Sequence, residues 1–249
     1  MLYPERLPRF TRVPAPVEAS ALLEWVWIPQ WDLPAGAQSR QPVLAYPAAN
    51  IVVDADGVTL WGATTRVSER VLRGSGWAVG ALLRPAALAC LSDAPGALVD
   101  AHAVLDDEPT GGLHRAVVAA MPDVQAAADV VAGWLERVVG PVTAEARLAN
   151  DMAELLMTDA GILGVDDAAE RLRVSVRTLQ RLAHRMVGVS PAAMIRRRRL
   201  QEAAQRVRDE PGTSLAAIAA NLGYADQAHL ANDFRTVLGI TATDYRAAR

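Results

Sequence analysis

The C-terminal third of the chain contains the same short pattern twice, and a repeat of this size strongly limits the folds open to it. Residues 169–175 match residues 219–225 in their small, apolar and turn positions, at an offset of 50. Beyond the turn the match resumes at an offset of 51, where Gly188 stands opposite Gly239. The second copy therefore has one more residue in its loop. The pattern indicates two copies of one small helical unit.

Each copy predicts a short helix, a tight turn and a second helix. Ser175 and Asp226 precede the second helices as N-caps, because their side-chain oxygens can accept hydrogen bonds from the first-turn N–H groups. Gly188 and Gly239 are typical C-terminal stops. In a helix-turn-helix, the second helix lies in the DNA major groove. The two second helices are therefore candidates for reading base edges.

The outward faces of these second helices carry side chains suited to DNA. Arginine pairs with guanine, and glutamine or asparagine pairs with adenine. The outward residues are Arg177, Thr178, Gln180, Arg181 and His184 in copy one, and Gln227, Ala228, His229, Ala231, Asn232 and Arg235 in copy two. A solvated surface is the alternative for either helix taken alone. Two capped copies at matched spacing favour DNA binding.

A series of spaced motifs runs from residue 175 to residue 241. It reads Ser175-x-x-x-Leu179-Gln-Arg181, Gly188-Val-Ser-Pro191, Arg199-Leu200-x-x-Ala203, Ile218-Ala219-x-x-Leu222-Gly223-Tyr224-x-Asp226-Gln227, Phe234-Arg235 and Gly239-Ile-Thr241. These motifs resemble the DNA-binding domain of AraC-type transcription regulators over roughly residues 150 to 249. The resemblance implies a long helix from about Pro191 to Arg208 between two helix-turn-helix units. It also implies double-stranded DNA as a partner and, for an activator, contact with RNA polymerase.

The resemblance assigns base-facing positions in both copies. They fall on Arg177, Gln180 and Arg181 in copy one and on Gln227, Ala228, His229 and Asn232 in copy two. The full expected DNA-binding set is Ser175, Arg177, Thr178, Gln180, Arg181, Arg185, Arg196, Arg197, Gln227, Ala228, His229, Asn232 and Arg235. Three positions depart from the family pattern, because Ala183 replaces an aromatic residue, Asn232 a common arginine and Ala242 a proline.

Positive charge is concentrated in copy one and the helix that follows it. Residues 171–208 contain eleven arginines and a single acid, whereas residues 211–249 contain three arginines and three aspartates. Because phosphate contacts supply most non-specific affinity, copy one should anchor DNA while copy two adds sequence preference or a protein-binding surface. Four consecutive arginines, 196–199, point in different directions on a helix. One or two of them should follow phosphate and Arg199 should brace the two units, with a solvated face as the alternative.

Length and composition favour two domains without a metal or disulfide framework. Residues 1–149 carry 11 arginines against 16 acids and residues 150–249 carry 14 against 12, which assigns DNA to the C-terminal part of the 249-residue chain. The single cysteine, Cys90, has apolar neighbours and is expected to be a buried thiol. No histidine cluster suggests a metal site, and no cofactor is expected. Without a signal peptide or a spanning apolar run, the chain is predicted to be cytoplasmic, with no membrane partner.

The first hundred or so residues predict a small β-barrel-like domain, since short apolar stretches alternate there with Pro and Gly. Residues 43–53, 61–66 and 79–85 resemble the short cupin-like N-terminal domain of one branch of these regulators, which implies a sensing or dimerising role. Aromatic walls suit small ligands. The candidate effector-binding residues are Trp25, Trp27, Trp61, Arg66 and Arg84, the arginines as anchors for an anion. A purely structural role is the alternative for each of them.

Helical patterns follow a polar break at residues 107–112. Residues 144–157 should open the DNA-binding domain. Residues 124–139 form either a helix of a homodimer, because Ala128 and Ala132 would allow close approach of a partner helix, or a helix packed on its own β domain. The predicted fold class is α+β. A β domain over 1–108 and a helical linker over 109–146 precede an all-α domain over 147–249 with two helix-turn-helix units joined by a long helix.

An enzyme or repair protein with an attached DNA-binding module is the second interpretation of the whole chain. It would need a nucleophile with a nearby base, and neither the flanks of Cys90 nor Thr64 and Thr65 provide such a pattern. The sequence therefore favours a transcription regulator, responsive to a small molecule in its N-terminal domain, over an enzyme.

Overall fold

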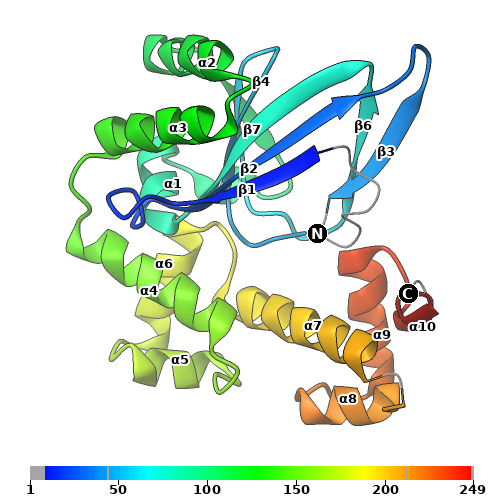
Figure 1. Cartoon of the computed structure of the whole chain (residues 1–249). Helices are drawn as coiled ribbons and strands as arrows, with labels where there is room; N and C mark the ends of the chain where they lie inside the picture. The colour runs from blue at the N-terminus through cyan, green and yellow to red at the C-terminus, as the bar shows by residue number, and fades with distance from the viewer. Residues whose placement is uncertain (1–8, 44, 211, 248–249) are drawn as a thin grey trace.

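The N-terminal half is built on an open antiparallel β-sheet. The computed structural model describes residues 9–43, 45–210 and 212–247. Its strands are β1 (Arg9–Pro14), β2 (Leu23–Asp32), β3 (Gln38–Val43), β4 (Asn50–Asp54), β5 (Val58–Trp61), β6 (Ser68–Arg73), β7 (Ser75–Leu83) and β8 (His102–Leu105). Six of them form one sheet in the order β1-β2-β7-β4-β5-β8, and β3 and β6 form a separate two-stranded sheet (Figure 1).

One face of the six-stranded sheet is covered by two helices, α2 (Glu108–Ala120) and α3 (Val124–Val139) (Figure 1). Successive side chains of a strand point to opposite faces, so alternate residues of β2, such as Val26 and Ile28, can share one side. They are buried in one core with Val117 of α2 and Leu135 of α3. Burial of this apolar surface is the main stabilisation of the region. We refer to the described residues from 9 to 139, which include both sheets, α2 and α3, as the β domain.

Helix α3 packs on its own sheet through the face that a dimer would need. Ala128, Val131, Ala132 and Leu135 are all buried in the core of the β domain. The second of the two alternatives for residues 124–139 is therefore the one observed. A dimer through Ala128 and Ala132 is incompatible with this arrangement, because the sheet already occupies their face.

The opposite face of the sheet carries tryptophans laid across glycines. A Cβ at position 80 would lie 2.1 Å from Cζ2 of Trp27, and a Cβ at position 76 would lie 2.4 Å from Cζ2 of Trp31. Glycine is therefore required where the two indoles approach β7. The indole nitrogen of Trp31 also donates to the carbonyl of Arg73, at 3.1 Å, so it ties β2 to the end of β6.

The strands do not close into the expected barrel. Strands β1 and β8 are the two edges of the six-stranded sheet, and no described strand joins one edge to the other. Strands β3 and β6 pair with each other along their whole lengths, from Gln38 opposite Arg73 to Val43 opposite Ser68. The β-barrel-like prediction is thus corrected to an open sheet with a two-stranded ribbon beside it.

The C-terminal half is helical and contains two cores. Its helices are α4 (Ala144–Thr158), α5 (Val165–Arg171), α6 (Val176–Met186), α7 (Pro191–Asp209), α8 (Leu215–Asn221), α9 (Gln227–Asp233), the π-helix η3 (Phe234–Leu238) and α10 (Ala242–Ala247). Helices α4 to α6 form the first core and α8 to α10 the second. Helix α7, the predicted long helix, contributes Met194 and Ile195 to the first core and Leu200 and Val207 to the second.

Caps begin and end the helices where the sequence predicted them. Ser175 Oγ accepts a hydrogen bond from the amide of Thr178 at 3.1 Å, and Asp226 Oδ1 accepts one from the amide of His229 at 2.7 Å. Each second helix is followed by its glycine, Gly188 with φ of 89° and Gly239 with φ of 74°. The matched geometry confirms two copies of one helix-turn-helix unit.

The single cysteine is exposed, which corrects the prediction of a buried thiol. Cys90 lies near the end of α1 (Pro85–Leu91), a helix of seven residues. The buried residues of this helix are Pro85, Ala86, Ala87 and Leu88. The sequence neighbours of Cys90, Ala89 and Leu91, are partly buried against the two cores, whereas Cys90 lies on the exposed side of the helix, so apolar neighbours in the sequence did not bring the thiol inside. A short 3-10 helix, η2 (Pro95–Leu98), follows α1.

The turn of copy one holds a strained residue that copy two avoids. Arg173 has a φ of 55°, whereas Gly223, its counterpart in the repeat, has a φ of 71°. A left-handed conformation costs a non-glycine residue about 1–2 kcal/mol, partly offset by the larger unfolded-state entropy of glycine. We expect Arg173→Gly to raise the free energy of unfolding by about 0.5–1 kcal/mol in urea denaturation. Gly223→Ala, the matched control, should lower it, and a less stable Arg173→Gly would contradict the prediction.

Candidate nucleic-acid interface

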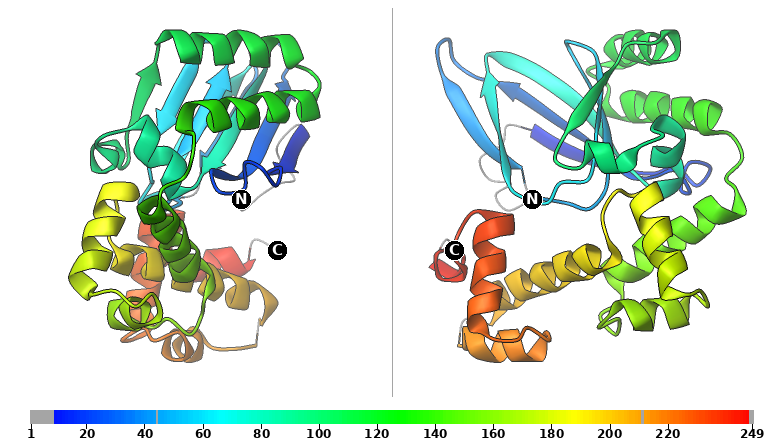
Figure 2. Two further views of the ribbon diagram at one scale, coloured as in Figure 1. Left: turned by 90° about the vertical axis from the view of Figure 1, so that its left-hand side faces the viewer. Right: turned by 180° about the vertical axis from the view of Figure 1, so that it is seen from behind.

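The two second helices, α6 and α9, stand at opposite ends of α7. In the view from behind (Figure 2, right), α6 (yellow) and α9 (red) both run upright below the β-sheet. The first turn of each helix is the end farther from the sheet. Each follows its short partner helix, α5 or α8, through a tight turn. The fold thus presents the N-terminal turns of both helices clear of the β domain.

Helix α6 presents three long polar side chains that have no bonding partner among the described residues. Arg177, Gln180 and Arg181 are exposed and make no hydrogen bond or ion pair with any residue that the structure describes. Ser175 and Thr178 lie with their hydroxyls 2.9 Å apart, within the cap. Free guanidinium and amide groups at the start of a helix are what base and phosphate recognition requires.

The later turns of α6 face the rest of the chain. Arg185 forms an ion pair with Glu145 of α4, so in this arrangement it is not free to contact DNA as expected. His184 lies over Gly96, and a Cβ at Gly188 would lie 2.6 Å from the carbonyl oxygen of Pro95. The end of α6 is therefore packed against η2 of the β domain while its beginning stays open.

Helix α9 carries the expected polar face with little charge. The exposed residues of this face are Gln227, Ala228, His229 and Asn232, with Arg235 in the following π-helix. The ring of His229 meets the ring of Tyr224 edge-on, with ring centres 5.2 Å apart. Copy two therefore offers hydrogen-bonding groups for bases but only one arginine beside them.

Arg196 is held by an acid from copy two. Its Nε lies 2.9 Å from each carboxylate oxygen of Asp233, a residue that is fully buried. This hydrogen-bonded pair raises the pKa of the Arg196 guanidinium. Asp233 consequently neutralises Arg196 and does not face DNA, and the predicted phosphate contact of Arg196 is replaced by an internal ion pair.

Arg197 is buried where the β domain meets α7. It is 8% exposed, and its Nε and Nη1 have no hydrogen-bond partner within the described part of the chain. Burial lowers its pKa to about 10, and Tyr46 and Tyr224 are the groups that interact with its charge. A phosphate cannot reach Arg197 in this arrangement, which corrects the prediction for this residue.

The last two arginines of the run hold neighbouring loops. Arg198 is buried and donates to the carbonyl of Ile162 at 2.6 Å. Arg199 donates to the carbonyls of Leu163 and Gly223. Because Leu163 precedes copy one and Gly223 is the turn of copy two, Arg199 braces the two units, as the sequence predicted.

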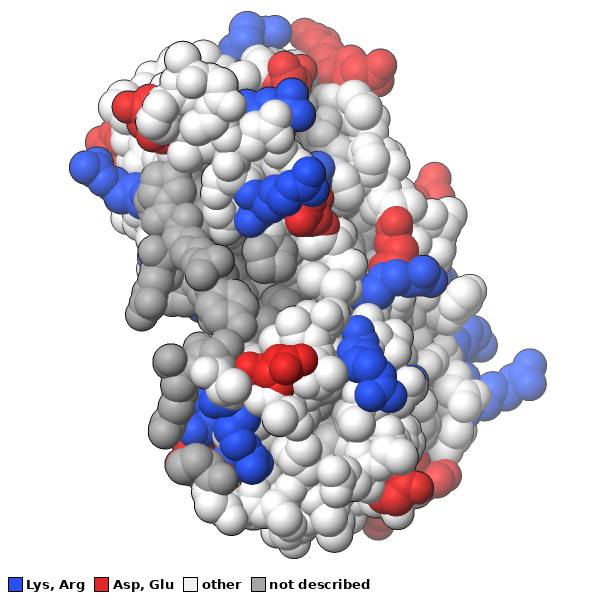
Figure 3. Space-filling model, turned by 90° about the vertical axis from the view of Figure 1, so that its right-hand side faces the viewer, with Lys and Arg blue, Asp and Glu red and all other residues white. Residues whose placement is uncertain are grey.

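Figure 3 shows the side of the molecule to which copy two contributes. Among the described residues drawn there, arginines are interspersed with acidic and uncharged groups and form no extended basic patch. Elsewhere, no three His, Cys, Asp or Glu residues within the described ranges are grouped so as to hold a metal ion. Nor does any described helix combine the length and apolar character needed to cross a bilayer.

Comparison with known proteins agrees with the geometry. A helix-turn-helix domain family matches residues 168–248, and a domain family of unknown function, DUF6597, matches residues 2–104. Two AraC-like transcription regulators, of Streptomyces antibioticus and Streptomyces lividans, are each 33% identical to the chain over 123 residues, or 49% of it. Over about half of its length, the chain is therefore similar to AraC-like transcription regulators. The matches cover 39% and 38% of the two regulators, so the chain spans about two fifths of the length of these curated relatives.

Solved structures give weaker likenesses. The C-terminal domain of AraT, a response regulator from Geobacillus stearothermophilus, is 21% identical and covers 43% of this chain and 89% of its own, with a TM-score of 0.37. ToxT from Vibrio cholerae O395 is 12% identical and covers 96% of this chain and 95% of its own, with a TM-score of 0.39. Both TM-scores lie below 0.5.

The three tryptophans predicted to bind an effector share one face of the sheet. Trp25 stands opposite Leu82, Leu82 opposite Asn50, and Asn50 opposite Trp61 across neighbouring strands. The indole nitrogen of Trp27 donates to Asn50 Oδ1 at 2.9 Å. Arginines already cover two of the indoles, with Arg12 4.6 Å from the ring centre of Trp25 and Arg70 3.9 Å from that of Trp61.

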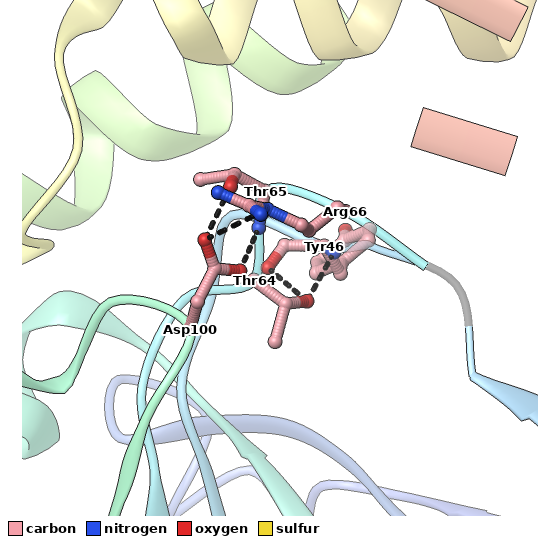
Figure 4. A network of polar contacts seen from close by, with 5 residues as sticks. All are labelled: Tyr46, Thr64, Thr65, Arg66 and Asp100. Atoms are coloured by element: carbon pink, nitrogen blue, oxygen red, sulfur yellow. Dashed lines mark hydrogen bonds and ion pairs between the residues drawn. The ribbon is translucent and has the colours of Figure 1, made fainter. Parts of the chain in front are cut away.

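Neither predicted anion anchor is free. Arg66 is exposed and lies 3.9 Å from Asp100, whose carboxylate also accepts from the amide and hydroxyl of Thr65 (Figure 4). In the same loop, the hydroxyl of Thr64 accepts from the amide of Tyr46 at 2.8 Å. Arg84 lies 3.2 Å from Glu154 of α4. Each of the two arginines therefore has an acidic partner within the chain. A ligand near Arg84 would depend on the other side chains around it.

Sequence reasoning missed two features of the interface. Asp233, the buried partner of Arg196, was not identified from the sequence. Tyr46 and Glu24 drew no attention, although they line a cavity between the β domain and α4. No local signal could have found either, because each depends on segments far apart in the chain.

The Arg196–Asp233 pair predicts a stability effect that a surface arginine would not have. Arg196→Met leaves the buried carboxylate of Asp233 uncompensated, and because the Arg196 side chain is 49% exposed we expect a loss of about 2–3 kcal/mol, below the range for a fully buried pair. Urea denaturation measures it. Adding Asp233→Asn should recover part of the loss, and an unchanged stability of Arg196→Met would contradict the assignment.

The open face of α6 predicts unequal contributions of the two copies to DNA affinity. We expect Arg181→Ala to weaken operator binding by about 1–3 kcal/mol and Asn232→Ala by less, because Arg181 is a free cation and Asn232 is neutral. Titration of labelled DNA measures both. Arg115→Ala, on the exposed side of α2, is the matched control, and a larger effect at Asn232 than at Arg181 would contradict the order.

Proposed function

We propose that this protein is a sequence-specific, DNA-binding transcription regulator of the AraC type. The observation that carries the proposal is the pair of exposed, capped helices, α6 and α9, at opposite ends of one continuous helix, α7. Such a pair suits two successive major grooves on one face of a duplex. The DNA-facing residues of the proposal are those of the predicted set that are exposed and unpaired: Arg177, Gln180, Arg181, Gln227, Ala228, His229, Asn232 and Arg235.

The two copies have different tasks in this proposal. Copy one supplies Arg177 and Arg181, the free cations near the start of α6, and so most of the phosphate contact. Copy two supplies neutral groups, Gln227, His229 and Asn232, and so mainly sequence preference. Its weakly charged surface leaves room for a protein partner such as RNA polymerase, if the regulator is an activator.

The N-terminal half is proposed as the sensing part, with the β-strands in residues 1–108, the connecting helices in residues 109–146 and the DNA-binding domain in residues 147–249. Trp25, Trp27 and Trp61 line one face of its sheet, and a small-molecule effector is its proposed partner. A homodimer would need a surface other than the buried face of α3. A cytoplasmic location and a non-enzymatic, regulatory role are parts of the same proposal.

Selection of bound duplexes from a random pool, with the full chain and over a salt series, tests the function. We expect one enriched motif with two unequal blocks, the stronger one lost in Arg181→Ala. The logarithm of affinity should fall with the logarithm of salt by about 0.9 for each phosphate contact. The absence of any enriched sequence would overturn the proposal, and the number of half-sites reports the oligomeric state.

A further inference from the structure

A cavity of about 230 Å³ lies between the β domain and the first helix-turn-helix unit. Its walls come from β2, from the loop that contains Tyr46, from the junction of β7 with α1, and from α4, α6 and α7. Its volume is below the usual range for drug-sized ligands, so a ligand that fits it is small. Charged side chains of both the β domain and the helical half line this cavity.

Three charged side chains line this cavity, and they do not balance. Arg84 is paired with Glu154 of α4 at 3.2 Å. Glu24 also lines the cavity, and its carboxylate has no hydrogen bond or ion pair to any described residue. The lining therefore carries one net negative charge. An anion would meet only Arg84, which Glu154 already neutralises, and would face the carboxylate of Glu24.

The unpaired carboxylate is partly removed from water. Burial raises the pKa of Glu24, an effect that the nearby Arg84 opposes and Glu154 reinforces. A carboxylate that loses hydration without gaining a partner is unfavourable, and a cation beside it would compensate. A cation bound beside Glu24 would therefore stabilise its carboxylate.

The other walls suit an apolar body attached to a cation. Tyr46 contributes aromatic surface, and aromatic faces attract ammonium groups; Trp25, whose ring already has Arg12 over it, adds apolar surface. Met157, Met186 and Met194 contribute thioethers, which are polarisable and fill irregular apolar space. The combination is one acid, aromatic surface and flexible apolar side chains.

We propose that this cavity binds a small organic cation, a primary or quaternary ammonium on an apolar group, with Glu24 as its counter-ion. Met186 ends α6 and Met194 lies in the first turn of α7, so the ligand would contact both the β domain and the first DNA-binding unit. Such a ligand changes DNA affinity only by binding two arrangements of these parts unequally. The regulatory consequence rests on the proposed function, whereas the binding itself does not.

Three probes of similar shape test which ligand charge the cavity prefers. They are cationic phenethylammonium, neutral 2-phenylethanol and anionic 3-phenylpropionate. Titration calorimetry and thermal denaturation of the full chain measure their binding. We expect the ammonium to bind about tenfold or more tightly than the alcohol, the effect of one charge-assisted hydrogen bond, and the carboxylate to bind more weakly than both. An ammonium that does not bind, or binds no better than the alcohol or the carboxylate, overturns the proposal.

Two substitutions locate the site. Glu24→Gln should remove the preference for the ammonium, whereas Glu18→Gln, an exposed acid of the same region, should leave it unchanged. Glu154→Gln should free Arg84 and move the preference toward the carboxylate. An ammonium preference that survives Glu24→Gln places the binding elsewhere and overturns the assignment.

Measuring DNA selection on the same preparations keeps the two proposals distinct. If a DNA motif is enriched and phenethylammonium does not bind, the cavity assignment fails and the regulator stands. If the ammonium binds through Glu24 and no DNA is selected, the proposed function fails and the cation site stands. If both hold, a change in DNA affinity on adding the ammonium shows that the site is regulatory.

Discussion

The structure depends on one helix that belongs to two cores. Helix α7 buries Met194 and Ile195 with copy one and Leu200 and Val207 with copy two, so each unit is completed by the same rigid rod. Side chains of the rod then tie each unit to it, because Arg196 binds the buried Asp233 of α9 and Arg199 binds the carbonyls of Leu163 and Gly223. The separation of the two second helices therefore follows from the length of α7 and not from a flexible connection.

The β domain adds a second constraint, since it touches equivalent ends of both units. Gly188 lies against the backbone of Pro95, and Gly239 lies against the side chain of Val67. Between these contacts, the buried amide of Asn150 in α4 donates to the carbonyl of Ala21 and accepts from the amide of Ala86. A change within the β domain is thus placed to act on both DNA-binding helices, and the cavity beside Glu24 lies in the same contact zone.

The repeat made the helical half predictable because its signals are local. Caps, glycine stops and apolar spacing act within a few residues, and they placed the second helices and the long connecting helix correctly. The β domain was harder, because strand order depends on distant pairings. The prediction of strands was confirmed. The prediction of a barrel was wrong, because β3 and β6 pair with each other instead of closing the sheet. The exposure of Cys90 was missed for a related reason, because its neighbours Ala89 and Leu91 pack against distant parts of the chain while Cys90 lies on the opposite side of α1.

The sequence by itself determined that two capped helix-turn-helix copies exist and that copy one has more positive charge, because composition and short-range spacing are properties of the chain. Only the tertiary structure decided which arginines are free. Arg177 and Arg181 stay open, Arg196 meets Asp233, and Arg197 is buried. An isolated helix cannot distinguish these outcomes, because the availability of a charge depends on which distant side chains reach it and on how much water they displace.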